Sequence, residues 1–176
     1  MDTLNLVKPH MGFEEKILEY RRLCLEKDGR VYGVGGLAEL TVPEWLNLLE
    51  KKSRPETCPE GLVPDSTYLC VRQGDNALVG MVNIRHTLND FLLQFGGHIG
   101  YSIHPLERGK GYGKEQLRLT LLECLKLGIS PALLTCEPWN AASRTVILSQ
   151  GGRLEDVREK PDGTKFERYW ISIREL

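Results

Sequence analysis

The segment from Ile99 to Gly113 constrains the fold of this chain more than any other part of it. Residues 98–104 have the composition of a β-strand, and Pro105 ends that strand because proline lacks the amide hydrogen that sheet pairing needs. A loop with three glycines follows, and apolar residues then recur at helical spacing from Leu117 onward. The segment therefore predicts a strand, a glycine-rich turn and a core-facing helix in immediate succession.

The glycine-rich turn, Arg108–Lys114, has the properties of an anion-binding site. The first amides of a helix have no partner within the helix, and the helix dipole adds partial positive charge. Glycines let the backbone approach a phosphate closely. Arg108, Lys110 and Lys114 add formal positive charge. The alternative is a glycine-rich turn between strand and helix that binds nothing.

Two common nucleotide-binding motifs do not fit this turn. A Walker A loop needs four residues between its glycine and the Gly-Lys pair, but only three separate Gly109 from Gly113. The dinucleotide fingerprint G-x-G-x-x-G would place its third glycine at Tyr112 or Lys114. A nucleotide-binding α/β domain is therefore disfavoured.

Hydrophobic patterning over the rest of the chain predicts the element order β-α-α-β-β-β-α-β-α-β-β. Hairpins mixed with a β-α-β unit indicate an α/β fold with a mixed sheet, and no linker or repeat divides residues 1–176, so we expect one domain. Predicted strands cover 4–7, 68–72, 78–85, 98–104, 132–136, 153–158 and 166–173, and predicted helices cover 13–27 and start near Thr41, Gly113 and Asn140.

Composition narrows the functional classes. Lysine and arginine number 23 against 24 acidic residues, so no nucleic-acid-binding surface is expected. The five cysteines include no C-x-x-C pair, which predicts neither a disulfide framework nor a zinc site, and no other metal is expected. No signal peptide and no apolar run of ~20 residues is present, so we expect a cytoplasmic protein without membrane contact.

The spacing R-x-x-G-x-G, formed by Arg108, Gly111 and Gly113 after a strand and a proline, resembles the GCN5-related N-acetyltransferase (GNAT) superfamily. The resemblance is strongest over residues 78–152, and the runs Asn83–His86 and Gly97–Tyr101 resemble one branch of predicted acetyltransferases. It implies a mixed, mostly antiparallel sheet of about seven strands flanked by about four helices, with splayed central strands. Dimers are common in the superfamily, so a homodimer is one expectation.

The resemblance also implies a reaction: acetyl transfer from acetyl-CoA to a primary amine, by direct attack in a ternary complex. The acceptor, a small-molecule or peptide amine, is not identified. In this family the loop amides hold the CoA pyrophosphate and a strand backbone bonds the pantetheine. Asn140 resembles the residue that bonds the pantetheine, although it is equally suited to be a helix N-cap. The implied cofactor-binding residues are Ile103, Arg108, Gly109, Lys110, Gly111, Tyr112, Gly113, Lys114, Asn140 and Ser143.

The chain departs from the family at Ile147, where many members carry the tyrosine that protonates the departing thiolate. Either Tyr101 or a water molecule replaces it, or release of the thiolate needs no dedicated acid. His98 occupies the place of a frequent catalytic glutamate, and its ordinary pKa of about 6.5 suits a base, although it could equally be a packing residue. Glu137 is a second candidate base.

The resemblance also implies that Arg85 and His86, at the end of the third predicted strand, lie beside the acceptor end of the site. Arg85 could bind an acceptor carboxylate with two hydrogen bonds, or it could form an ordinary ion pair. Because the family tyrosine is missing, the alternative to an enzyme is a non-catalytic acyl-CoA-binding module.

Overall fold

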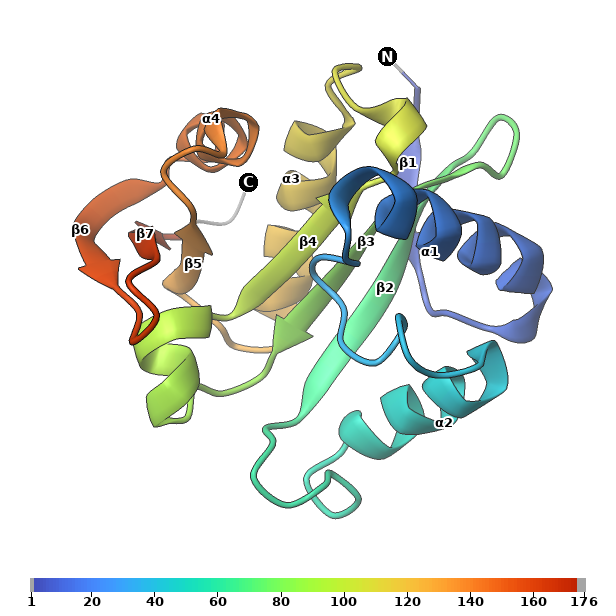
Figure 1. Cartoon of the computed structure of the whole chain (residues 1–176), viewed down its shortest axis with the longest axis horizontal. Helices are drawn as coiled ribbons and strands as arrows, with labels where there is room; N and C mark the ends of the chain where they lie inside the picture. The colour runs from blue at the N-terminus through green and yellow to red at the C-terminus, as the bar shows by residue number, and fades with distance from the viewer. Residues whose placement is uncertain (1, 174–176) are drawn as a thin grey trace.

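A β-hairpin is the centre of the fold in the computed structural model, which describes residues 2–173 (Figure 1). It consists of β2 (Asp65–Arg72) and β3 (Leu78–Arg85). In the turn, the Asp75 carboxylate accepts hydrogen bonds from Arg72 Nη2 (2.7 Å) and from the Ala77 amide (3.1 Å). Residue 1 and residues 174–176, at the ends of the predicted domain 1–176, lie outside the described residues.

The hairpin belongs to a four-stranded sheet in the order β1-β2-β3-β4, in which every neighbouring pair is antiparallel. β1 is Leu4–Val7 and β4 is Ile99–Ile103. β4 therefore lies at one edge of this sheet, hydrogen-bonded on one side only to β3.

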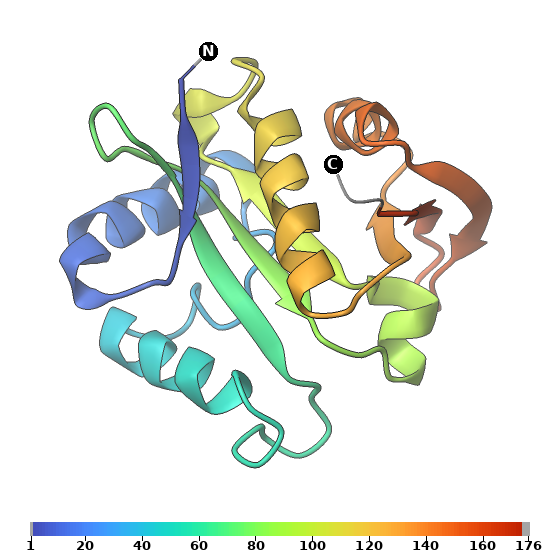
Figure 2. The ribbon, with the colours of Figure 1, turned by 180° about the vertical axis from the view of Figure 1, so that it is seen from behind.

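Helices cover both faces of this sheet (Figures 1 and 2). Helices α1 (Glu14–Asp28) and α2 (Val42–Lys52) pack on the face that presents Leu69, Val71 and Met81. Helix α3 (Tyr112–Lys126) packs on the opposite face, against Val82 and Ile84. Both faces of β3 are therefore buried, which explains its nearly continuous apolar sequence.

The second sheet has three strands in the order β5-β7-β6, again with antiparallel pairs. They are β5 (Ala132–Cys136), β6 (Arg153–Glu159) and β7 (Lys165–Ile171). Helix α4 (Ala141–Ser149) lies beside α3. Within residues 2–173, no helix is long and apolar enough to span a membrane.

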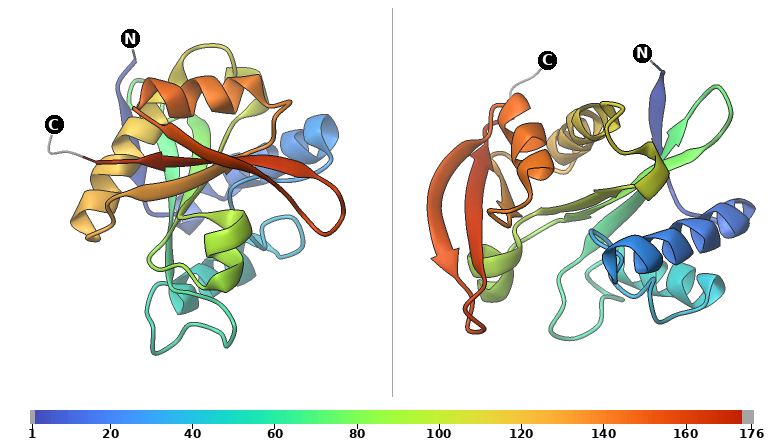
Figure 3. Two further views of the ribbon diagram at one scale, coloured as in Figure 1. Left: turned by 90° about the vertical axis from the view of Figure 1, so that its left-hand side faces the viewer. Right: turned by 45° about the horizontal axis from the view of Figure 1, so that its top comes forward.

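The two sheets meet where β4 and β5 begin and then diverge (Figure 3). The His98 amide donates to Leu133 O (2.7 Å), and the Leu133 amide donates to His98 Nδ1 (3.0 Å). No ladder joins β4 to β5 beyond this point in the described residues. The prediction of an α/β fold with seven strands, four α-helices and splayed central strands is therefore confirmed.

Local differences from the prediction concern element ends. β2 begins at Asp65, three residues earlier than expected, because Asp65 is buried there in an ion pair with Lys52 of α2. The loop predicted between β3 and β4 contains a π-helical turn, Leu92–Gly96. His98 and His104 flank β4 without belonging to it.

The connection between α1 and α2 crosses directly over β4 (Figure 1). A Cβ atom on Gly33 would lie 2.7 Å from the Tyr101 backbone, and Tyr32 O accepts a hydrogen bond from Ser102 Oγ (2.8 Å). Gly33 also has a positive φ of 81°. The contact therefore requires glycine on both counts.

We expect Gly33→Ala to lower the free energy of unfolding by about 3 kcal/mol, because the new methyl group displaces the connection from β4 and a left-handed backbone disfavours alanine. Gly29→Ala is the matched control: its φ is 70°, but nothing lies within 4 Å of its Cβ position. It should cost only about 1 kcal/mol. Equal losses in urea unfolding would contradict the close contact at Tyr101.

Candidate active site

The gap between β4 and β5 presents unpaired backbone groups. The His104 amide donates to Val79 O (2.9 Å), and only alternate residues of an antiparallel strand face the partner strand. The backbone groups of Tyr101 and Ile103 therefore face away from β3, toward the gap. Ile103 O already accepts a hydrogen bond there from Arg108 Nε (3.2 Å).

The glycine-rich turn forms the end of this gap. Gly109 and Gly111 have φ of 79° and 87°, the left-handed region that the turn requires. Gly111 is the N-cap of α3 and its position has no side-chain cap. The Lys114 amide donates to Gly111 O (3.2 Å), so the amides of Tyr112 and Gly113 are the ones in the first turn that face a ligand. A Cβ on Gly113 would lie 3.1 Å from Val146, so the absence of a side chain lets α3 approach α4.

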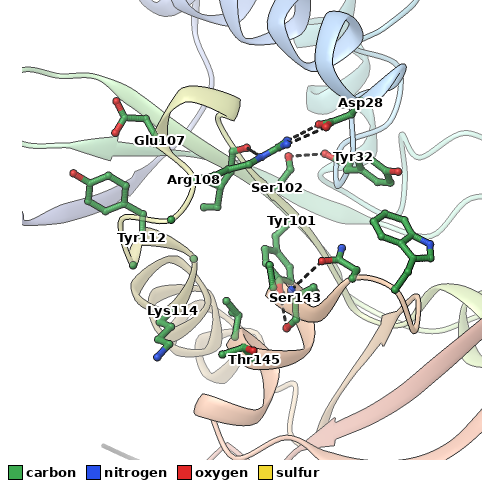
Figure 4. Close-up of a pocket in the computed structure, with 18 residues that line it drawn as sticks. Asp28, Tyr32, Tyr101, Ser102, Glu107, Arg108, Tyr112, Lys114, Ser143 and Thr145 are labelled. Atoms are coloured by element: carbon green, nitrogen blue, oxygen red, sulfur yellow. Dashed lines mark hydrogen bonds and ion pairs between the residues drawn. The ribbon is translucent and has the colours of Figure 1, made fainter.

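Ion pairs take up two of the three cationic side chains of this turn. Arg108 forms two hydrogen bonds with the Asp28 carboxylate at the end of α1, which depress the pKa of that carboxyl group (Figure 4). Lys110 binds Glu107 (2.9 Å). Lys114 is the one not taken up by an ion pair in the described residues, and it is exposed at the gap.

A large cavity of about 710 Å³ occupies the gap (Figure 4). Every predicted cofactor-binding residue lines it except Lys110, whose side chain is directed to Glu107. Sequence reasoning missed Tyr32 and Trp139, which also line it. The side chain of Trp139 is 69% exposed, and an exposed tryptophan beside the Asn140 motif was a signal in the sequence.

A small cavity of about 300 Å³ lies next to the large one. Tyr32, Tyr101, Asn140 and Ser143 line both, so the two cavities meet at these residues. Predicted residue Arg85 lines the small cavity, as does Glu137. The structure thus places all the predicted cofactor residues except Lys110, and one predicted acceptor residue, in two adjoining cavities.

Tyr101 and Ser143 form a hydrogen-bonded pair at the meeting point, with 2.8 Å between Tyr101 Oη and Ser143 Oγ (Figure 4). Burial raises the pKa of Tyr101 to about 12, so its hydroxyl keeps its proton at neutral pH. Asn140 Oδ1 accepts from the Ser143 amide (3.0 Å), which makes Asn140 the N-cap of α4. Ile147, at the position of the family tyrosine, is fully buried in the core.

The structure does not bring His98 and His86 to the cavities. His98 Nδ1 accepts the Leu133 amide, so the ring proton resides on Nε2 and no lone pair is free for a base. His86 Nε2 lies 2.8 Å from Ser66 Oγ. Neither histidine lines either cavity. We therefore carry neither one into the proposed reaction.

The described residues contain no group of three or more His, Cys, Asp or Glu side chains placed to hold a metal ion. All five cysteines are free, and four of them are buried.

Comparison with known proteins decides the family. The family model of the acetyltransferase (GNAT) domain matches residues 22–153. The chain belongs to the GNAT acetyltransferases. The resemblance inferred from the glycine-rich turn is therefore confirmed, and the chain is an acyltransferase. No curated protein matches it.

Solved structures of GNAT enzymes share the fold. An acetyltransferase of the GNAT family from Bacillus anthracis has a TM-score of 0.66 at 21% identity, over 99% of this chain and 98% of that one. The microcin C7 self-immunity acetyltransferase MccE, in complex with acetyl-CoA and AMP, has a TM-score of 0.66 at 16% identity, over 98% of this chain and 94% of that one. RimL, a ribosomal L7/L12 alpha-N-protein acetyltransferase in complex with coenzyme A, has a TM-score of 0.67 at 16% identity, over 97% of this chain and 94% of that one.

His98 should contribute to stability rather than to catalysis. Burial, with a smaller effect of Arg85, lowers its pKa below the ordinary 6.5. The unfolded chain therefore binds the proton more readily than the folded chain. The contribution of neutral His98 to the free energy of unfolding is complete above pH 6.5, and it declines as the pH falls toward the lower pKa of the folded state. Protonation of Nδ1 would also remove the acceptor for the Leu133 amide.

We expect His98→Asn, whose Oδ1 can accept that amide, to fold well and to lose part of this acid sensitivity. His98→Ala should be less stable at every pH, by about 1–3 kcal/mol. Urea unfolding from pH 5 to 8 measures both, and the difference from the parent removes the effects of the other histidines. Identical pH profiles for the parent and His98→Asn would contradict the assignment.

Proposed function

We propose that the chain transfers the acetyl group of acetyl-CoA to an amine, with both substrates bound together. The observation that carries the proposal is the meeting of two cavities at Tyr101 and Ser143. The large one borders the uncapped start of α3 and the unpaired edge of β4, and the small one is free for an acceptor. A module that only binds acyl-CoA has no need of the second cavity.

The residues of the large cavity fit acetyl-CoA. The amides of the glycine-rich turn and the dipole of α3 suit a pyrophosphate. The free edge at Tyr101 and Ile103 offers backbone donors and acceptors to the amide groups of pantetheine. Bound acetyl-CoA supplies the thioester carbonyl that the amine attacks.

Side chains at the meeting point and in the small cavity can move the protons that the reaction requires. In the transfer, a C–N bond forms and a C–S bond breaks; the amine loses one proton and the sulfur gains one. Glu137, the one carboxylate among the residues lining the small cavity, attracts an ammonium group and accepts the proton that leaves it before the attack, which then passes to solvent. The second proton, released from nitrogen on the attack, replaces the one that Tyr101 gives to the sulfur. The Tyr101 hydroxyl, supported by Ser143, holds the proton for the departing sulfur.

Release of free CoA thiol in the presence of a panel of amines and amino acids tests this function directly. We expect turnover with at least one acceptor and CoA binding measurable by calorimetry. Tight CoA binding without turnover on any acceptor would instead identify a non-catalytic acyl-CoA-binding module.

Gly111→Ala should weaken CoA binding at least tenfold. A left-handed residue with a Cβ is strained by about 1–2 kcal/mol, and relaxation of the turn moves its amides out of register with the pyrophosphate. Gly128→Ala is the matched control, because Gly128 at the far end of α3 has φ of 72° and an equally open Cβ position. Both variants should lose similar thermal stability. Equal affinity for CoA in the two variants would place the pyrophosphate elsewhere.

Tyr101→Phe should lower kcat about 100-fold while leaving the KM for acetyl-CoA nearly unchanged, because the variant lacks only the proton donor. Tyr68→Phe serves as the control: Tyr68 lies on β2, its hydroxyl contacts Glu123 (3.5 Å), and it lines neither cavity. A Tyr101→Phe enzyme with parental kcat would assign proton donation to water.

A further inference from the structure

The small cavity contains an arginine without a counter-ion. Arg85 at the end of β3 is partly buried, yet no carboxylate of the described residues lies within ion-pair distance of its guanidinium. By contrast, Arg72, Arg144 and Arg168 each bind a carboxylate within 3.0 Å. The ordinary ion pair that the sequence left open for Arg85 is therefore absent from this part of the chain.

Only one nitrogen of the Arg85 guanidinium is engaged. Nη1 donates to Gly96 O (3.4 Å) and Gly97 O (3.3 Å), both long hydrogen bonds. Nε and Nη2 have no partner in residues 2–173, and neither atom is a fully enclosed, unsatisfied group. These two donors point along one edge of the planar group, which is the arrangement that binds a carboxylate with two parallel hydrogen bonds.

Asp65 is the obvious candidate for a counter-ion, since it lies opposite Arg85 in the β2–β3 ladder. Its carboxylate is instead paired with Lys52. Burial lowers the pKa of Arg85, and the attraction of Asp65 only partly offsets that effect. The guanidinium is thus held in a desolvated place where an added anion would stabilise it.

The position of Arg85 relative to the meeting point is also defined. Its Nη2 would lie 3.3 Å from a Cβ on Gly100, the neighbour of Tyr101 in β4. Only glycine at this place leaves room for the guanidinium beside the backbone of β4. The Arg85 guanidinium therefore lies beside Gly100, the residue that precedes the proposed proton donor Tyr101 in β4.

The remaining charges of the small cavity are also mostly basic. Arg30 lies over the Tyr32 ring (4.9 Å), and Lys160 lies over the Phe166 ring (5.8 Å). Three cations thus accompany a single carboxylate, Glu137. A simple amine would meet net repulsion here, whereas a molecule with both an ammonium and a carboxylate group finds a partner for each.

We infer that the acceptor is a free amino acid, held by its carboxylate at Arg85 and by its ammonium at Glu137. The inference rests on the proposed acetyl transfer. Chemistry favours a free amino acid over a peptide, because a free amino acid carries its ammonium and carboxylate groups on one carbon, whereas the carboxyl group next to a peptide N-terminus is consumed in the peptide bond. The reaction would then yield an N-acetylamino acid.

The test compares amino acids with their amides, which keep the amine and the side chain but lose the negative charge. CoA release is measured with the twenty common amino acids, the corresponding amino acid amides, and short peptides with free N-termini. We expect kcat/KM for the best amino acid to exceed that for its amide at least 30-fold. Equal rates for acid and amide, or a preference for peptides, would overturn the inference while leaving the acetyl transfer intact.

Variants of Arg85 test whether this residue causes the preference for amino acids over their amides. Arg85→Gln should raise the KM for the amino acid about 30-fold to 100-fold and remove the discrimination against the amide; Arg85→Lys should restore part of it. Arg21→Gln is the control, since Arg21 also donates to backbone carbonyls (Leu40 O, 2.8 Å) but lines neither cavity. A preference for the acid that survives in Arg85→Gln would exclude Arg85 as the carboxylate partner.

A binding experiment separates failure of this inference from failure of the proposed reaction. The best amino acid should raise the melting temperature of the CoA-bound parent protein, and its amide should not. Arg85→Gln should abolish that shift even if no acetyl transfer is detected with any acceptor. No shift with any of the twenty amino acids would overturn the inference on its own.

Discussion

The reciprocal hydrogen bonds between His98 and Leu133 determine where the gap between the two sheets begins. They join the two sheets at one end of β4 and β5, and beyond them the strands separate. Backbone groups of Tyr101 and Ile103 that a continuous sheet would use then face the gap, where Ile103 O accepts a hydrogen bond from Arg108 Nε (3.2 Å). Burial of such groups without partners is costly, so the gap is a place for a ligand with amide groups of its own.

The packing around the gap keeps it open. Helix α3 supports β3 from one side, and the crossing of Gly33 over Tyr101 fixes β4 from the other. Tyr20 and Ser102, joined by a buried hydrogen bond (2.7 Å), attach β4 to α1. The Arg108–Asp28 pair then ties the glycine-rich turn to the end of the same helix. The position of the turn is thus set by contacts distant in sequence.

Those distant contacts separate what the sequence could predict from what it could not. The turn, its helix and the seven strands follow from local patterns: glycine spacing, proline and hydrophobic periodicity. The role of His98 depends on which ring nitrogen meets Leu133, 35 residues away. Asp28, the ion-pair partner of Arg108, lies 80 residues away in the sequence. Arg85 has no counter-ion because Asp65, its neighbour across the ladder, forms its ion pair with Lys52. No local pattern contains that information.

The two cavities differ in whether main-chain or side-chain groups are available to bind a ligand. In the proposed reaction, the large one binds its ligand mainly through main-chain groups of the turn and of β4, which tolerate changes of side chain provided that the glycines remain. The small one depends on the side chains of Arg30, Arg85, Glu137 and Lys160. On this proposal, mutations in the small cavity exchange one acceptor for another without disturbing the proposed cofactor site. A lineage built on this scaffold can diverge in its choice of substrate while its architecture persists, even at the identities of 16–21% seen among the related structures.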